Sequence, residues 1–168
     1  MERDIVLHGV HLGEHSFEAD KMIEEIVNTD EENAVNVAIV GKYVQLEDSY
    51  LSVMESIKHA GYKNGVKTEI KLVDSETVNE NNVKEIFGDV KAIIVQGGFG
   101  EKGIEGNIVA IKYARENKIP FLGICLGMQM AVIEYASNVL GLSDADSIAF
   151  NEKTKNPVIH IMEEQKKI

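Results

Sequence analysis

Short apolar runs that alternate with segments of helical spacing limit what this chain can fold into more than any other feature. The apolar runs have the length of β-strands and lie at residues 35–40, 68–73, 91–95 and 119–124. Two of them contain VAIV and AIIV, which are apolar throughout, as expected for strands buried on both faces. Strands and helices that alternate through short connections form a parallel sheet with helices on both faces. We therefore predict an α/β fold.

The predicted helices follow these strands and place apolar residues three and four positions apart. The four segments are 49–61, 79–88, 103–117 and 128–139. In the first, Asp48 or Ser49 is suited to cap the start, and Gly61 is suited to end the helix. We expect a flavodoxin-like arrangement of this parallel sheet and its helices.

The N-terminal part of the chain differs in texture from the rest. It contains a predicted strand, a predicted helix and an acidic stretch that we interpret as a solvated linker. In order, these segments are 5–10, 17–27 and 29–33. We predict an N-terminal extension of unknown role at 1–34, followed by a domain at 35–168.

Composition disfavours several classes of protein. The chain has 168 residues, the size of one domain, and no apolar run approaches the ~18 residues of a membrane-spanning helix. The formal net charge of −11 disfavours nucleic acids and anionic membranes as partners, because Lys and Arg bind their phosphates. One cysteine cannot form an internal disulfide, and the N-terminus lacks the basic region of a secretory signal. We expect a cytoplasmic protein and leave open whether it forms homo-oligomers.

The single cysteine, Cys125, lies in the pattern G-x-C-x-G between a predicted strand and a predicted helix. There the pattern is typical of a nucleophile elbow, a tight turn that exposes the side chain at the carboxyl edge of the sheet. A helix N-terminus favours the thiolate, and the N–H of Leu126 would point at a developing oxyanion. The alternative is a small core residue, because free cysteines are among the most buried residues. The flanking glycines favour the nucleophile.

A second glycine cluster, QGGFGEKG, occupies residues 96–103 after a predicted strand. It formally matches the dinucleotide-binding pattern G-x-G-x-x-G. That fingerprint needs an acidic residue at the end of the next strand, where this chain has Cys125. A glycine-rich loop also presents backbone N–H groups to an anionic centre. Nucleotide binding is therefore the weaker interpretation, and we expect the loop to supply a second oxyanion donor to the neighbouring cysteine strand.

Five stretches are recognisable together: VAIVGKYV, DSYLSV, GGFGEKGIEG, AIKYARENKIPFLGICLGMQMAVIEYA and NPVI. They resemble the glutamine amidotransferase domain of the CTP synthase family, a class I, triad-type amidotransferase. The resemblance covers residues 35–161, and the two glycine-containing motifs are highly specific. It implies a glutaminase in which a thiolate attacks the side-chain amide of L-glutamine and releases ammonia. Water then hydrolyses the resulting thioester to glutamate.

The resemblance also implies residue roles and partners. Cys125 would be the nucleophile. The residues that would form the oxyanion hole and hold the substrate are Gly98, Leu126, Gly127, Met128 and Gln129. No metal ion or cofactor is implied for this chain, because ATP, Mg²⁺ and UTP belong to a separate synthase domain that makes CTP, while GTP activates the glutaminase. The implied partners are L-glutamine and a synthase domain or complementary fragment on another chain.

Departures from the family pattern fall mainly on the glutaminase chemistry. The family's triad histidine and glutamate lie well downstream of the cysteine, and we find no match for them before Ile168. His160 and His59 are more typical of surface or structural residues. Ala149 stands where the family has a glutamate that binds the substrate's amino group, and Gln96 replaces a proline. We expect the C-terminal part of the domain to be missing and the chain alone to be inactive, with a non-catalytic interaction or regulatory module as the alternative.

Three histidines near the N-terminus, His8, His11 and His15, have spacings that suit metal ligands on a helix. Gly9 and Gly13 would interrupt such a helix, and no cysteine or acidic partner is evident. We therefore predict no metal site.

Overall fold

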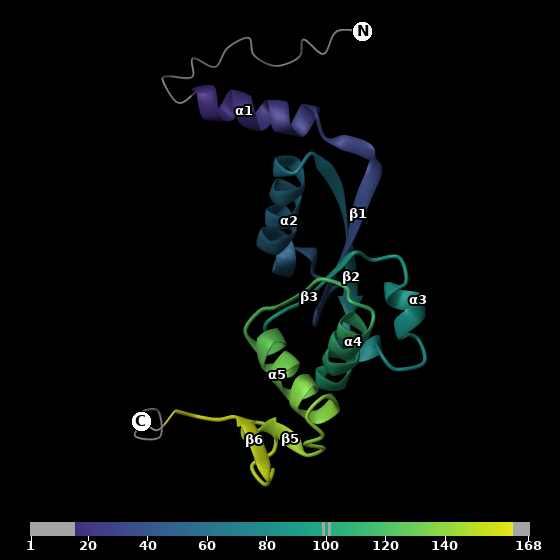
Figure 1. Cartoon of the computed structure of the whole chain (residues 1–168). Coiled ribbons are helices and arrows are strands. Elements are labelled where there is room, and N and C mark those ends of the chain that lie inside the picture. Colours follow the sequence, from purple (N-terminus) through teal and green to yellow (C-terminus); the bar gives the residue numbers. More distant parts are fainter. Residues whose placement is uncertain (1–15, 99, 101, 163–168) are drawn as a thin grey trace.

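The computed structural model describes residues 16–98, 100 and 102–162. Its centre is a four-stranded, all-parallel sheet with the strand order β2-β1-β3-β4 (Figure 1). The strands are β1 Asp30–Gly41, β2 Val66–Asp74, β3 Ala92–Val95 and β4 Phe121–Gly123. Each strand overlaps one predicted apolar run, so the predicted α/β fold with a parallel sheet is confirmed.

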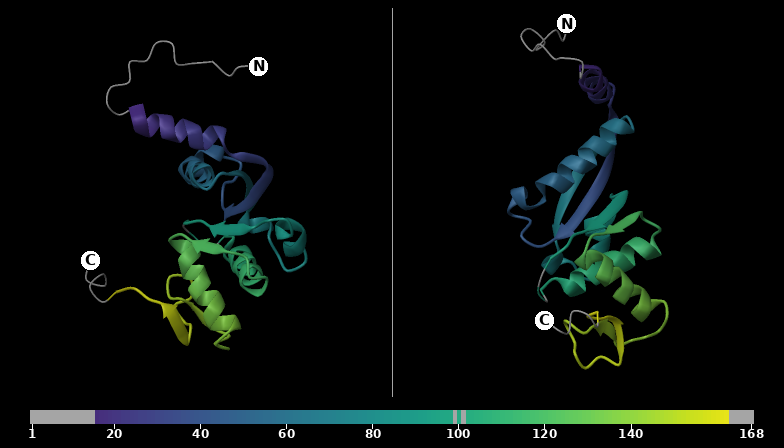
Figure 2. Two further views of the ribbon diagram at one scale, coloured as in Figure 1. Left: turned by 45° about the horizontal axis from the view of Figure 1, so that its top comes forward. Right: turned by 90° about the vertical axis from the view of Figure 1, so that its left-hand side faces the viewer.

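Helices lie on both faces of this sheet (Figure 2). One face carries α2, which packs on β2, and the other carries α4, which contacts its neighbours α3 and α5. The helices are α1 Ser16–Val27, α2 Leu51–Lys63, α3 Val83–Phe87, α4 Ile104–Glu116 and α5 Leu126–Asn138. Two short 3₁₀ helices, η1 Glu47–Tyr50 and η2 Ser75–Thr77, follow β1 and β2.

The main core lies between the sheet and helices α3, α4 and α5. Ala38 and Val40 of β1 and Ile93 and Val95 of β3 are fully buried in it. Val40 lies in register with Val95 on one side and with Val73 of β2 on the other. Because all four strands run in the same direction, their carboxyl ends meet at one edge of the sheet. The glycine loop and the cysteine both lie at this edge.

A charged pair fixes α5 to α4. The Nε–H of Arg115 on α4 lies 3.1 Å from both carboxylate oxygens of Glu134 on α5, and a second guanidinium nitrogen donates to Oε1 at 2.7 Å. Asn138 donates to the same carboxylate at 3.2 Å. The hydrogen bond to Glu134 raises the pKa of Arg115. Glu134 is only 1% exposed, and a buried carboxylate is tolerated when it is paired and hydrogen-bonded in this way.

The acidic stretch at 29–33 is not a linker, so that prediction is wrong. β1 begins at Asp30, which pairs with Val66 of β2, and the register shifts between Asp30 and Val35. The acidic residues therefore belong to the N-terminal end of the strand, beyond the four residues that pair with β3.

The predicted ends of α2 are also wrong. Asp48 and Ser49 lie in η1, and no side chain caps the start of α2. The helix continues beyond Gly61, which is buried against β2, where a Cβ would lie 2.7 Å from the carbonyl oxygen of Val66. Gly61 thus serves close packing, and the turn after the helix is made by Gly65 at φ 67°.

At the N-terminal side, the predicted helix at 17–27 is confirmed as α1. The predicted strand at 5–10 and His8, His11 and His15 lie outside the described residues. The predicted boundary between 34 and 35 stays a prediction, and β1 runs through it.

Two short strands that the periodicity did not predict follow α5 and pack against it. They are β5 Ala145–Ser147 and β6 Asn156–Ile159, and they pair in parallel. Asp144 holds them together, because its carboxylate accepts hydrogen bonds from the side chain of Asn156 and from Lys155 N–H. None of the helices in the described part of the chain is long and apolar enough to cross a membrane.

Candidate functional site

Cys125 lies at the turn between β4 and α5, where it is the N-cap residue of the helix. Its backbone has φ 53° and ψ −107°, a positive φ that side-chain-bearing residues rarely adopt. Its side chain is exposed. The alternative of a buried core cysteine is therefore wrong, and the strained turn has the form of a nucleophile elbow.

The two glycines that flank the cysteine are required by this close turn. A Cβ at Gly123 would lie 2.6 Å from the nitrogen of Met128, in the first turn of α5. A Cβ at Gly127 would lie 2.1 Å from the carbonyl oxygen of Val95 on β3. Both contacts are with backbone atoms, so strand and helix approach this closely only because both residues lack a side chain.

The glycine loop after β3 lies directly against the cysteine. A Cβ at Gly97 would lie 3.2 Å from Cβ and 3.9 Å from Sγ of Cys125, and one at Gly98 would lie 3.8 Å from a methyl group of Leu126. β3 pairs with β4, which confirms that the loop and the cysteine are on neighbouring strands. Leu126 is the first residue of α5, so its N–H has no intrahelical acceptor. The structure thus brings Cys125, Gly98 and Leu126 together.

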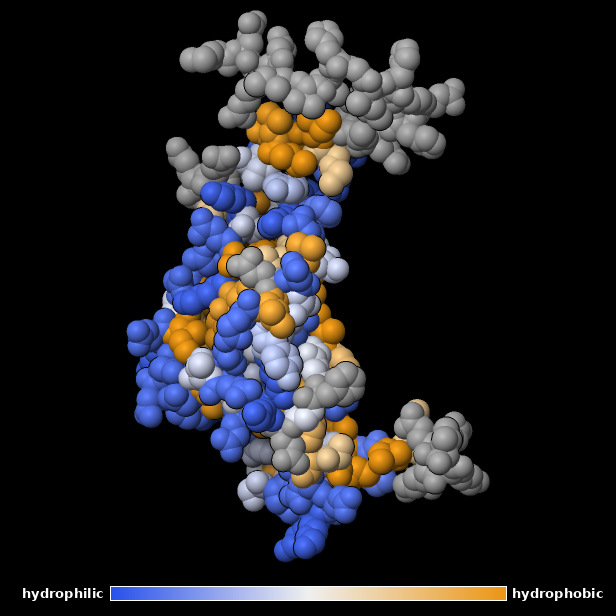
Figure 3. Space-filling view, turned by 180° about the vertical axis from the view of Figure 1, so that it is seen from behind, coloured by the Kyte–Doolittle hydropathy of each residue, from blue (hydrophilic) through white to orange (hydrophobic). Residues whose placement is uncertain are grey.

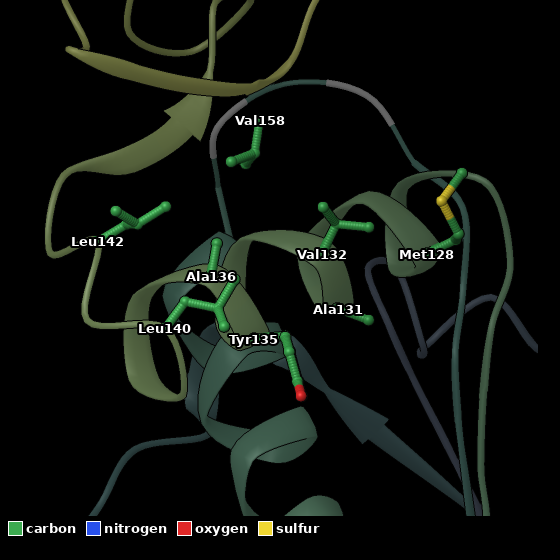
Figure 4. A pocket seen from close by; sticks show the side chains of 8 residues that line it. All are labelled: Met128, Ala131, Val132, Tyr135, Ala136, Leu140, Leu142 and Val158. Carbon is green, nitrogen blue, oxygen red and sulfur yellow. The ribbon is translucent and has the colours of Figure 1, made fainter.

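The other residues expected to hold the substrate lie in the first turn of α5. Gly127 N–H donates to the carbonyl of Ile124 at 2.9 Å, and Gln129 N–H donates to the carbonyl of Cys125 at 3.2 Å. Gln129 is half-buried, whereas the Met128 side chain is 49% exposed. Figure 4 shows Met128 among the side chains that line a groove along α5.

Residues at the end of β1 support the glycine loop, and sequence patterns did not reveal this support. Lys42 Nζ donates to the carbonyl of Gly100 at 3.0 Å, and the Tyr50 hydroxyl donates to the carbonyl of Lys42. Burial raises the pKa of the Tyr50 phenol. Gln96, in the position of the family's proline, is 7% exposed and its N–H donates to the carbonyl of Val40 at 2.9 Å. The only signal in the sequence was a lysine, Lys42, directly after the last residue of the first core strand.

Neither of the two described histidines contacts the cysteine. His59 lies in the second half of α2, where its ring is tilted against that of Tyr62 with 6.5 Å between the centroids, and it lines a hollow with residues of α1. His160 is exposed beyond β6, and its Nδ1 lies 2.7 Å from the carbonyl of Ile161. Within 16–98, 100 and 102–162, no hydrogen bond joins a histidine to Cys125. The same residues form no group of three or more potential metal-binding side chains.

The segment after β5 has no carboxylate at the position where the resemblance places one. Ala149 is exposed, and its N–H donates to the hydroxyl of Ser147 at 3.2 Å. Ser147 itself is buried at 1% exposure. The segment is therefore an ordered turn that presents a methyl group where the resemblance predicts a glutamate.

A parallel sheet with a nucleophile elbow at its carboxyl edge and a glycine loop beside it defines a class of protein. The family described as glutamine amidotransferase class-I matches residues 45–167, which is most of the chain. The chain therefore belongs to the class I glutamine amidotransferase family.

Within this class, the chain is similar to the CTP synthases. The CTP synthase of Clostridium beijerinckii is 49% identical over 168 residues, which cover 98% of this chain and 31% of that protein. The CTP synthase of Clostridium acetobutylicum is 52% identical over 151 residues, which cover 90% of this chain and 28% of that protein. The chain thus spans about a third of the length of these curated relatives.

A solved structure places the similarity in one domain of such proteins. The glutaminase domain of Trypanosoma brucei CTPS, with bound acivicin, matches this chain with a TM-score of 0.71 at 40% identity. The match covers 77% of this chain and 50% of that one. This chain is therefore similar to the glutaminase domain of a CTP synthase, and the match extends over half of that solved chain.

Proposed function

We propose that this chain supplies the nucleophile of a glutaminase that releases ammonia from L-glutamine for the amination of UTP to CTP. The observation that carries the proposal is Cys125, exposed and strained at the start of α5 with the glycine loop against it. Membership of the amidotransferase family and similarity to CTP synthases support the substrate and the product.

In this proposal the thiolate of Cys125 attacks the side-chain amide carbon of glutamine. The negative charge that develops on the carbonyl oxygen is stabilised by the N–H groups of Gly98 and Leu126. Ammonia leaves, a glutamyl thioester remains on Sγ, and water hydrolyses it to glutamate. Met128 and Gln129 help to hold the substrate. They lie in the first turn of α5, which can approach β3 closely because Gly127 has no side chain.

The proton transfers need groups beyond those described. A cysteine nucleophile of this type uses a base to activate the thiol and to protonate the leaving amine. No described histidine contacts Cys125, and Ala149 has no carboxylate to pair with the substrate's ammonium group. We propose that a complementary part of the glutaminase fold supplies these groups. A synthase domain would bind ATP, Mg²⁺ and UTP, GTP would act as activator, and the reaction would take place in the cytoplasm.

A second candidate function is a non-catalytic interaction or regulatory module that retains the amidotransferase fold. Ala149 favours it, because loss of a carboxylate that pairs an ammonium in a desolvated site costs about 2–5 kcal/mol of binding. Nucleotide binding at 96–103 has less support, because Cys125 occupies the position where the ribose-binding acid would lie.

The test is glutamine-dependent ammonia release by the chain alone and by Cys125→Ala. We expect no release by the chain above the level of the variant, because no histidine among the described residues contacts the thiol. Release that Cys125→Ala abolishes would contradict this expectation and would place a base within the chain. Labelling of Cys125 with the glutamine analogue diazo-oxo-norleucine separates the two functions. In the presence of the complementary part, a glutaminase reacts with the analogue, whereas a non-catalytic module does not. Iodoacetamide is the control, because it modifies the exposed thiol in either case.

A further inference from the structure

Tyr50 is a buried aromatic residue whose hydroxyl group has no part in the chemistry proposed for Cys125. Hydrophilic residues cover much of the surface in the space-filling view (Figure 3), whereas Tyr50 is only 9% exposed. Its ring lies so close to Gly41, the last residue of β1, that a Cβ there would be 2.9 Å from Cζ of the ring. Tyr50 therefore reaches the carboxyl end of β1, at the edge of the sheet where the glycine loop and the cysteine lie.

The backbone that Tyr50 holds lies just beyond the sheet. Lys42 follows β1, whose pairing with β3 ends at Val40 and whose pairing with β2 ends at Gly41. The hydroxyl of Tyr50 donates a hydrogen bond to the carbonyl oxygen of Lys42. Burial raises the pKa of the Tyr50 phenol, so the hydroxyl keeps its proton and remains a donor at neutral pH. This hydrogen bond thus takes the place of sheet pairing at Lys42.

The end of β1 holds the glycine loop on both sides of Gly98. On one side, Gln96 N–H donates to the carbonyl of Val40 at 2.9 Å. On the other side, Lys42 Nζ donates to the carbonyl of Gly100 at 3.0 Å. A lysine side chain is long and flexible, so it fixes the loop only if its own backbone is held. The hydroxyl of the buried tyrosine provides this restraint.

We propose that Tyr50 is a positioning residue, which holds the oxyanion donor Gly98 in place by way of Lys42. This inference deepens the proposed function and rests on it, because the N–H of Gly98 acts only when an oxyanion develops at the site. A Cβ at Gly97 would lie 3.2 Å from Cβ of Cys125, so any shift of the loop moves its N–H groups relative to the nucleophile. An oxyanion donor stabilises the transition state more than the bound substrate, so its displacement lowers kcat and leaves KM unchanged.

The alternative is that Tyr50 only fills the core. Tyr50→Phe separates the two roles, because it keeps the ring against Gly41 and removes only the hydroxyl. Tyr62→Phe is the matched control, since it removes the same group from the last turn of α2, whereas Tyr50 directly precedes the first turn. Circular dichroism verifies that both variants remain folded.

The first measurement is the backbone order of the full chain by ¹⁵N relaxation, which needs no enzymatic activity. We expect order parameters of about 0.85 for the N–H groups of Gly98 and Gly100 in the unchanged chain and in Tyr62→Phe, and values below about 0.6 in Tyr50→Phe. Lys42→Met should lower them equally, and adding Tyr50→Phe to it should lower them no further, because the two residues act in series. Order parameters that Tyr50→Phe leaves unchanged, or that fall further in the double variant, would overturn the proposal.

The second measurement is ammonia release from L-glutamine by the chain together with the complementary part of the glutaminase fold. We expect Tyr50→Phe to lower kcat by about tenfold with KM unchanged, since removal of a whole oxyanion donor costs about 100-fold or more. An unchanged kcat, or a raised KM alone, would overturn the positioning role. If no ammonia is released at all, the glutaminase function is contradicted, while the order parameters still decide whether Tyr50 positions the loop. The two proposals therefore fail in distinguishable ways.

Discussion

At the scale of single residues, the site is built from backbone strain and missing side chains. Cys125 has a positive φ, which is held by the packing of β4, α5 and the glycine loop around it. Gly123 and Gly127 allow this packing. The spacing of these glycines was visible in the sequence, so the elbow could be predicted. The support that Lys42 and Tyr50 give to the loop could not, because it depends on contacts between segments far apart in the chain.

The strain at Cys125 leads to a prediction about stability. Cys125→Gly should be more stable than Cys125→Ala by about 1 kcal/mol, because glycine adopts a positive φ without steric cost. Both variants remove the thiol from the exposed position, so the comparison isolates the backbone. Urea unfolding monitored by circular dichroism measures the difference. Equal stability of the two variants would show that the turn is not strained.

At the scale of elements, the apolar runs predicted the four strands of the main sheet and the glycine loop beside the cysteine. β5 and β6 were not predicted, because they are three and four residues long and depend on the hydrogen bonds of Asp144. The groove on α5 was also missed, although its signal was present: residues 128–139 are apolar on more than one face of the helix.

The approach of α5 to β3 gives a prediction at this scale. Gly127→Ala should destabilise the protein by about 3 kcal/mol, because the new methyl group would overlap the carbonyl oxygen of Val95. Gly98→Ala is the control. Its methyl group would make an ordinary contact at 3.8 Å with Leu126, so the free energy of unfolding should change little. Thermal unfolding of the two variants distinguishes them, and a well-tolerated Gly127→Ala would contradict the described packing.

At the scale of the whole molecule, the described residues place the strained turn of Cys125 at the start of α5, a helix whose side chains line an apolar groove. Its relatives are about three times as long, and the solved domain is twice the size of the part that matches. The nucleophile and the proposed oxyanion donors belong to one half of a fold, while the proposed base belongs to the other. The chemistry at Cys125 should therefore depend on the part that supplies this base.

The most direct test of this account is the rate of glutamine-dependent ammonia release, measured for the chain with and without the complementary half of the glutaminase domain. The account expects no release from either part alone, and release from the complex that Cys125→Ala abolishes. Release by the chain alone, or release from the complex that persists in Cys125→Ala, would contradict it.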